Sequence, residues 1–150
     1  MSSSHNILFT LLLTVALVLA SCNRKAIYSH YEATPVEGWS SSDTLHFELG
    51  PVFRDGTYQE MLNLRTTSAY PFTDLTVVVH QKVLPSGKES VDTLSITLDK
   101  SQKTTIRHHS LSLDAISLTA DERIAVSIHH YMKKESLPGI TDVGMCIDAE

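Results

Sequence analysis

Alternation of apolar and polar residues is the feature that most constrains the fold of this chain. After residue 42, apolar side chains recur at every second position, as at Ile124, Val126 and Ile128. A period of two places these side chains on one face of a β-strand, whereas a helix needs a period near 3.6. The centre of residues 75–84 is Val77-Val78-Val79, a run that predicts burial on both faces. Strands are therefore expected over residues 45–49, 58–67, 75–84, 91–98, 104–113, 123–131 and 142–147.

Turn residues separate these segments. Asp55-Gly56 favours a tight hairpin, and Pro85-Ser86-Gly87 and Pro138-Gly139 mark two further turns. Only residues 111–122 could hold a helical turn. The pattern predicts an all-β chain, an antiparallel β-sandwich of the immunoglobulin-like or jelly-roll-like kind with about seven or eight strands. A small up-and-down β-barrel is the alternative.

The amino-terminal segment does not show this alternation and has the features of a signal peptide. An apolar run over residues 7–18 closes on Leu19-Ala20-Ser21-Cys22, which resembles a bacterial lipobox. The run is shorter than the ~20 residues that a membrane-spanning helix needs. We therefore expect residues 1–21 to be a cleaved lipoprotein signal peptide and Cys22 to be the lipidated, triacylated amino terminus. Two or more acyl chains anchor a protein stably to a membrane.

The mature chain is expected to have two parts. Residues 22–42 contain Pro35, Gly38 and a serine run, which predict a lipidated tether and loop. Residues 43–150 are predicted to form the single β-sandwich domain. Tyr28, Tyr31 and Trp39 are the weak ligand-binding candidates, because exposed aromatic rings can stack on a sugar or peptide. The competing interpretation is that an aromatic side chain plugs an open end of the sandwich.

Charge and cysteine content limit the possible partners. The formal net charge is −5, and all 12 Lys and Arg and all 17 acidic residues follow Cys22. Nucleic acid requires a basic surface, so we expect no nucleic-acid partner. If Cys22 is lipidated, Cys146 has no disulfide partner. Its strand-like surroundings predict a small buried or half-buried side chain.

Histidine is the only residue type that suggests a metal or catalytic site. His108-His109 and His129-His130 both fall in predicted strands, where neighbouring side chains point to opposite faces. Each pair can offer one imidazole to a shared face, and His80 would be a third ligand only if its strand lay beside both. We therefore expect no metal and no cofactor, with one histidine of each pair facing solvent and the other hydrogen-bonded inside. The chain lacks nucleophile-elbow, His-Glu-x-x-His and phosphate-loop motifs, so an enzyme is not expected.

Several segments resemble the GldH-type gliding-motility lipoproteins of Bacteroidetes. They cover most of the mature chain in order: 62–65, Tyr70-Pro71-Phe72-Thr73-Asp74-Leu75, 85–88, 91–94 and 137–145, the last containing Gly139-Ile140-Thr141-Asp142-Val143-Gly144. Between residues 99 and 124 the chain departs from the family, where a longer stretch with Trp and Gly is expected.

The resemblance implies a non-enzymatic lipoprotein of the cell envelope, associated with gliding machinery and the allied type IX secretion system. It would be held by lipid on Cys22 and would act on other envelope proteins. Asn23 after the cysteine, with no acidic run behind it, resembles the sorting pattern for the outer membrane and predicts a periplasm-facing domain. The alternative function is a periplasmic or surface module that binds glycan or peptide.

Overall fold

The computed structural model describes residues 26–150, and every regular element in that range is a β-strand. None of these residues forms a helix that is long and apolar enough to cross a membrane. The strands are β1 (Tyr28–Ala33), β2 (Trp39–Ser40), β3 (Leu45–Leu49), β4 (Gly56–Thr66), β5 (Asp74–Leu84), β6 (Glu89–Thr97), β7 (Arg107–Ser112), β8 (Ile116–Leu118), β9 (Arg123–His130), β10 (Ser136–Leu137) and β11 (Ile140–Ala149).

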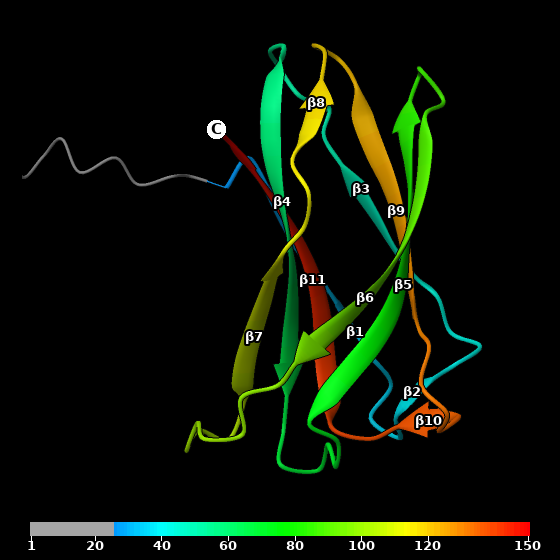
Figure 1. Cartoon of the computed structure of the whole chain (residues 1–150), viewed down its shortest axis with the longest axis vertical. Coiled ribbons are helices and arrows are strands. Elements are labelled where there is room, and N and C mark those ends of the chain that lie inside the picture. The colour runs from blue at the N-terminus through cyan, green and yellow to red at the C-terminus, as the bar shows by residue number, and fades with distance from the viewer. Residues whose placement is uncertain (1–25) are drawn as a thin grey trace, which may run out of the picture.

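The strands form two antiparallel sheets that pack face to face (Figure 1). One sheet has the order β1-β11-β4-β7, with β8 also paired to β4, and the other has the order β3-β9-β5-β6. A short ladder of β2 and β10 lies at the lower end in the view of Figure 1. The predicted all-β sandwich is confirmed. The barrel alternative is wrong, because the described strands divide between separate sheets and do not close on themselves.

Strict alternation along the central strands builds the core between the sheets. In β4, β5 and β9 every second side chain is buried, and the residues between them are partly exposed. Val77 and Val79 are buried, but Val78 is only half-buried. The centre of β5 is therefore fully buried on one face only, whereas the run of three valines predicted burial on both. Sequence and structure agree best here, because one face of each strand must leave water.

The tether prediction for residues 22–42 needs a correction. Tyr28–Ala33 form β1, which pairs with β11 over six residues in one register. Without β1, the N–H and C=O groups on that edge of β11 would have no ladder partner. Gly144 allows the close approach, because a Cβ there would lie 2.6 Å from the ring of Tyr31. The sandwich therefore begins at Tyr28 and not at residue 43.

Two turn predictions had different outcomes. Pro85-Ser86-Gly87 joins β5 to β6, with Gly87 at φ 75° and its N–H bonded to the carbonyl of Val83 at 2.7 Å, which confirms the hairpin. Asp55-Gly56 was expected to close a tight hairpin, and this was wrong. The strands on either side, β3 and β4, belong to different sheets, so residues 50–55 cross between layers. The possible helical turn in 111–122 is also absent, since β8 pairs there with β4.

The core extends to the lower end of the sandwich, where β2 and β10 contribute Trp39 and Leu137 to it. Trp39 is fully buried, and its indole N–H donates to the carbonyl of Asp43 at 3.0 Å. Two residues after Leu137, the strand partner of Trp39, Gly139 has φ 79°, and its carbonyl accepts from the N–H of Thr67 at 2.7 Å. A Cβ at position 139 would lie 2.3 Å from the backbone nitrogen of Tyr70. The turn before β11 therefore fits against residues 67–70 only if position 139 has no side chain.

Gly139→Ala should destabilise the protein by about 2–5 kcal/mol, since it combines a left-handed backbone with a steric clash. The matched control is Gly87→Ala, which has φ 75° but nothing within 4 Å of its added Cβ. We expect that variant to cost about 1–2 kcal/mol from the backbone alone. Urea denaturation of both variants measures the difference. Equal destabilisation would show that the contact with Tyr70 does not limit position 139.

Candidate functional site

A cleft of about 440 Å³ opens on one side of the sandwich, between β6 and the β7–β8 segment. These elements lie on the face of the molecule turned toward the viewer in Figure 1. The cleft is lined by Glu60, Val79, Gln81, Ser90, Asp92, Leu94, Ser112, Leu113, Asp114, Ala115 and Ile116. Alternation in β6 directs Ser90, Asp92 and Leu94 to this side.

A buried carboxylate forms the floor of the cleft. Glu60 of β4 is only 2% exposed, and the amide nitrogen of Gln81 in β5 donates to its two oxygens at 3.1 and 3.0 Å. The hydroxyl of Ser90 in turn donates to the Gln81 side-chain carbonyl at 3.3 Å. The chain of three polar groups thus links one sheet to the other across the interior.

The charge of Glu60 is not compensated within the described part of the chain. Burial raises the pKa of its carboxyl group; the hydrogen bond from Gln81 lowers the pKa, and the nearby charge of Asp92 raises it. Among residues 26–150, no Lys, Arg or His forms an ion pair with Glu60. A buried charge with only a neutral partner is costly, so this group requires an explanation beyond folding.

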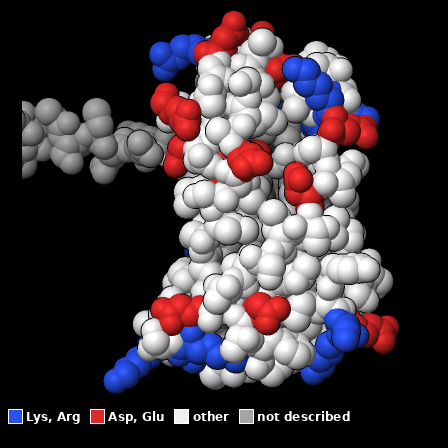
Figure 2. Space-filling view, viewed as in Figure 1, with Lys and Arg blue, Asp and Glu red and all other residues white. Residues whose placement is uncertain are grey.

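The walls of the cleft combine apolar and acidic character. Val79 and Leu94 come from one sheet, and Leu113 and Ile116 come from the other side. Asp92 and Asp114 are exposed. None of the lining residues is basic. On the face shown in Figure 2, the Lys and Arg side chains lie mainly toward the two ends of the molecule. The cleft therefore suits a ligand that carries both an apolar part and a positive charge.

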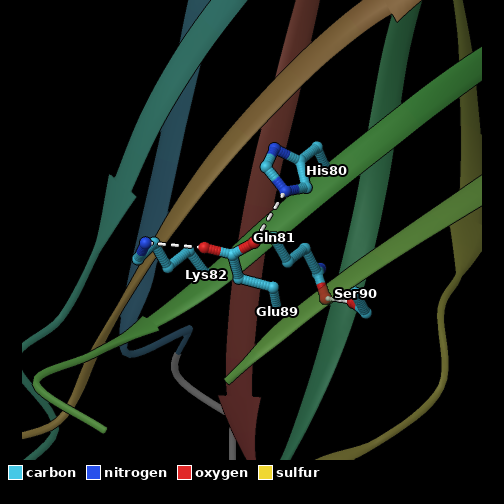
Figure 3. A network of polar contacts seen from close by, with 5 residues as sticks. All are labelled: His80, Gln81, Lys82, Glu89 and Ser90. Carbon is cyan, nitrogen blue, oxygen red and sulfur yellow. Dashed lines mark hydrogen bonds and ion pairs between the residues drawn. The ribbon is translucent and has the colours of Figure 1, made fainter. Parts of the chain in front are cut away.

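The outer face of the β3-β9-β5-β6 sheet carries paired charges of both signs. There, Glu89 pairs with Lys82 at 2.6 Å and with His80 at 3.8 Å, all three side chains being about half exposed (Figure 3). These contacts lower the pKa of Glu89, the hydrogen bond from Lys82 most of all. Figure 3 also shows that Gln81, between His80 and Lys82, takes part in a separate contact with Ser90. A hollow of about 600 Å³ on this face is lined by charges of both signs, Glu48 and Lys82. These solvated groups pair with Arg123 and Glu89 respectively.

The three predicted aromatic candidates do not form one platform. Trp39 is fully buried, so it presents no stacking face to solvent and occupies the position of a plug. Tyr28 and Tyr31 are half-buried on the edge strand β1. The guanidinium of Arg65 lies 4.0 Å from the ring centre of Tyr31, and Asp142 lies 4.0 Å from Arg65. Tyr31 is thus already covered by a cation from its own chain.

The histidine pairs divide as their strand positions predict. His108 is exposed and His129 half-buried, whereas His109 and His130 are buried at 7% and 2% exposure. His109 bonds to the hydroxyl of Thr66 at 3.0 Å. The two buried rings lie in different sheets, and burial lowers the pKa of each. Within residues 26–150, no three His, Cys, Asp or Glu side chains gather as a metal site would require.

The hydrogen bonds of His130 show that its imidazole ring is neutral. Its Nε2 lies 3.1 Å from the carbonyl oxygen of Trp39, which can only accept. Nε2 therefore carries the proton, and Nδ1 accepts from the N–H of Met132 at 3.4 Å. The imidazole also contacts the Trp39 indole edge-on, with ring centres 5.3 Å apart. This histidine is a structural part of the lower end.

The two cysteines differ in what can be said of them. Cys22, the predicted lipidation site, lies outside the described residues. Cys146 is half-buried in β11, and burial raises the pKa of its thiol, with Asp148 adding to that effect. A raised pKa keeps the thiol protonated and unreactive, in agreement with a packing role.

Glu60 and Gln81 were not singled out from the sequence, although a signal was present. Both occupy inward positions in otherwise apolar alternations: Tyr58, Glu60, Leu62 in one strand and Val79, Gln81, Val83 in the other. A polar residue at such a position is expected to find a polar partner. That the two face each other depends on how the sheets stack, which neither strand encodes alone.

Comparison with known proteins gives one family. A family model described as GldH lipoprotein matches residues 26–147. The "Gliding motility lipoprotein GldH" of Flavobacterium johnsoniae is 27% identical over 92% of this chain and 94% of its own length. The "Gliding motility lipoprotein GldH homolog" of Christiangramia forsetii is 26% identical over 93% of each chain.

Solved structures resemble the chain only loosely. A domain within a family GH115 4-O-methyl-α-glucuronidase superposes with a TM-score of 0.48 at 13% identity, over 85% of this chain and 18% of the enzyme. A family 35 carbohydrate-binding module from Clostridium thermocellum gives a TM-score of 0.38 at 14% identity, over 81% and 89%. Likenesses of this size say nothing about what the chain binds.

Replacing Glu60 by Gln should stabilise the protein at pH 7.5, by about 1–2 kcal/mol, because the amide keeps the shape and carries no charge. The raised pKa sets the sign of the pH dependence. Relative to the unfolded chain, the wild type loses stability as pH rises from 4.5 through the folded-state pKa. The gain from the substitution should therefore be larger at pH 7.5 than at pH 4.5.

Urea denaturation of both proteins at the two pH values measures this gain. Glu48→Gln is the control, because that carboxylate is 64% exposed and should change stability little at either pH. If the Glu60→Gln variant is less stable than the wild type at pH 7.5, the Glu60 carboxylate stabilises the folded protein and the prediction is wrong.

Proposed function

The chain belongs to the GldH lipoprotein family, and from that membership we propose that it is a lipid-anchored, non-enzymatic accessory protein of the cell envelope that works by binding other envelope proteins. The observation that carries the proposal is the extent of the match. The family model covers residues 26–147, which include all of the sandwich except the end of β11. The names of the two relatives connect them with gliding motility and mention no reaction.

Cys22 is the proposed attachment point. The first described hydrogen bond to the sandwich is made by the N–H of Ile27, at 2.8 Å from the carbonyl of Ile147. Four residues therefore separate Cys22 from Ile27, and the five steps between them span at most about 18 Å when fully extended. A triacylated Cys22 would hold the sandwich close to the membrane surface. With a net charge of −5, the protein has little electrostatic attraction to anionic lipid, so the acyl chains must supply the anchoring.

We further propose that the protein resides in the outer membrane and faces the periplasm. The support is the sequence after Cys22, where Asn23 is followed by Arg24-Lys25 and no acidic run. The competing function, binding of glycan or peptide through Tyr28, Tyr31 and Trp39, has less support. Trp39 is buried and Tyr31 is covered by Arg65, so these rings offer little stacking surface.

Substituting Cys22 by Ala should abolish incorporation of a palmitate analogue in growing cells and release the protein from the membrane fraction. Cys146→Ala is the matched control, because its thiol is half-buried in β11 and should leave labelling unchanged. Equal labelling of the wild type and the Cys22→Ala variant would exclude Cys22 as the lipidation site.

Affinity purification of the full-length lipoprotein in mild detergent should recover specific envelope proteins, whereas a mock purification should not. Protease added to intact cells should leave the domain uncut if it faces the periplasm. Failure to recover any partner, together with saturable binding of an oligosaccharide, would favour the glycan-binding alternative. Digestion in intact cells would reverse the proposed orientation.

A further inference from the structure

We propose that the cleft between β6 and the β7–β8 segment binds a lysine or arginine side chain, presented by an extended segment of a partner protein that pairs with the free edge of β6. This inference rests on the proposed function in protein binding and assigns a place and a chemistry to it.

The shape and lining of the cleft match such a side chain. The hollow of about 440 Å³ leads past apolar walls to a carboxylate that is 2% exposed. Lys and Arg side chains have an apolar stem and a charged tip, so they can contact Leu94 and Leu113 along the stem and reach Glu60 with the tip. A purely apolar ligand would bury the carboxylate further without neutralising it.

Charge complementarity favours a cationic ligand. Glu60, Asp92 and Asp114 line the cleft, and no basic residue does. Gln81 donates through one nitrogen only, so lone pairs on the Glu60 oxygens remain free for a second donor. A cation that enters would supply both a counter-charge and hydrogen bonds, which are stronger between charged groups.

The edge of β6 favours a protein segment over a small amine. β6 is the last strand of its sheet and pairs with β5 alone, from Glu89 to Thr97, without a shift in register. It contains no proline and no lysine, two common means of blocking an edge. Its outward N–H and C=O groups can therefore pair with an added strand, and alternate side chains of that strand would point to the cleft.

The fold does not need an ionised group at position 60. A leucine or a glutamine would suit the inward position better, because neither has to be desolvated as an ion. Binding sites commonly retain such costly groups, since the ligand compensates for them when it arrives. Glu60 fits this description, as its neighbours provide one amide and further negative charge but no cation.

The test uses the full-length lipoprotein in mild detergent and two blocked pentapeptides. One has a central lysine flanked on each side by valine and then threonine; the other has norleucine, which keeps the stem and lacks the charge. Binding is measured by fluorescence anisotropy at pH 7.5. We expect the lysine peptide to bind at least about tenfold more tightly than the norleucine peptide. A lysine peptide with N-methylated backbone amides should bind more weakly, because it cannot extend the sheet.

Variants then assign the effect to the cleft. Glu60→Gln should remove the preference for lysine, and Asp114→Asn, at an exposed position, should independently reduce it. Glu48→Gln, which lies on another part of the surface, should leave the preference unchanged. Equal affinity for the two peptides, or an unchanged preference in both cleft variants, would overturn the inference. So would binding of cellohexaose that is lost in Glu60→Gln, which would make the cleft a sugar site.

The outcome separates this inference from the function on which it rests. If affinity purification recovers envelope partners with the wild type and the same partners with Glu60→Gln, protein binding stands and the cleft is not its site. If the wild type recovers no partner and shows no preference for the lysine peptide, both proposals fail.

Discussion

Burial of one face of β4, β5 and β9 is the interaction on which the rest of the structure depends. Each strand contributes every second side chain to the space between the sheets, and a slip by one residue would expose that whole set to water. At about 25 cal/mol for each Å² of apolar surface removed from water, this face outweighs any single polar contact in the molecule. Strands β3, β6, β7, β8 and β11 each pair with one of these three, and β1 pairs in turn with β11.

Segments that resemble the family reach both the lower end of the sandwich and the cleft. Tyr70 and Gly139, from two of the segments that resemble the family, meet at the lower end, and Leu137 pairs there with Trp39. His130 completes this cluster through the Trp39 carbonyl. These residues close one end of the sandwich and so preserve its shape. Residues 91–94, another segment that resembles the family, supply Asp92 and Leu94 to the lining of the cleft.

The cleft exists because the two sheets contact each other along one pair of edges and remain apart along the other. On one side, β1 and β3 approach each other, and contacts form directly between them. On the other side, β6 and the β7–β8 segment stay apart, and Glu60 and Gln81 meet at the bottom of the gap. A buried carboxylate beside an open strand edge combines two unfavourable features for an isolated domain. Both become favourable when a cationic strand binds, which is why this side of the molecule is the more informative one for function.

The sequence by itself determined the strand-rich class, most strand positions, the β5–β6 hairpin, and the division of each histidine pair into a buried and a more exposed member. These features depend on local chemistry: alternation, turn residues, and the opposite directions of neighbouring side chains in a strand. Tertiary structure alone decided that β1 joins the sheet, since its polar sequence gains order only from the unpaired edge of β11. It also decided that residues 50–55 cross between layers and that Glu60 faces Gln81. Such contacts depend on how two sheets stack, which is set by the summed burial of many strands and cannot be deduced from any one of them.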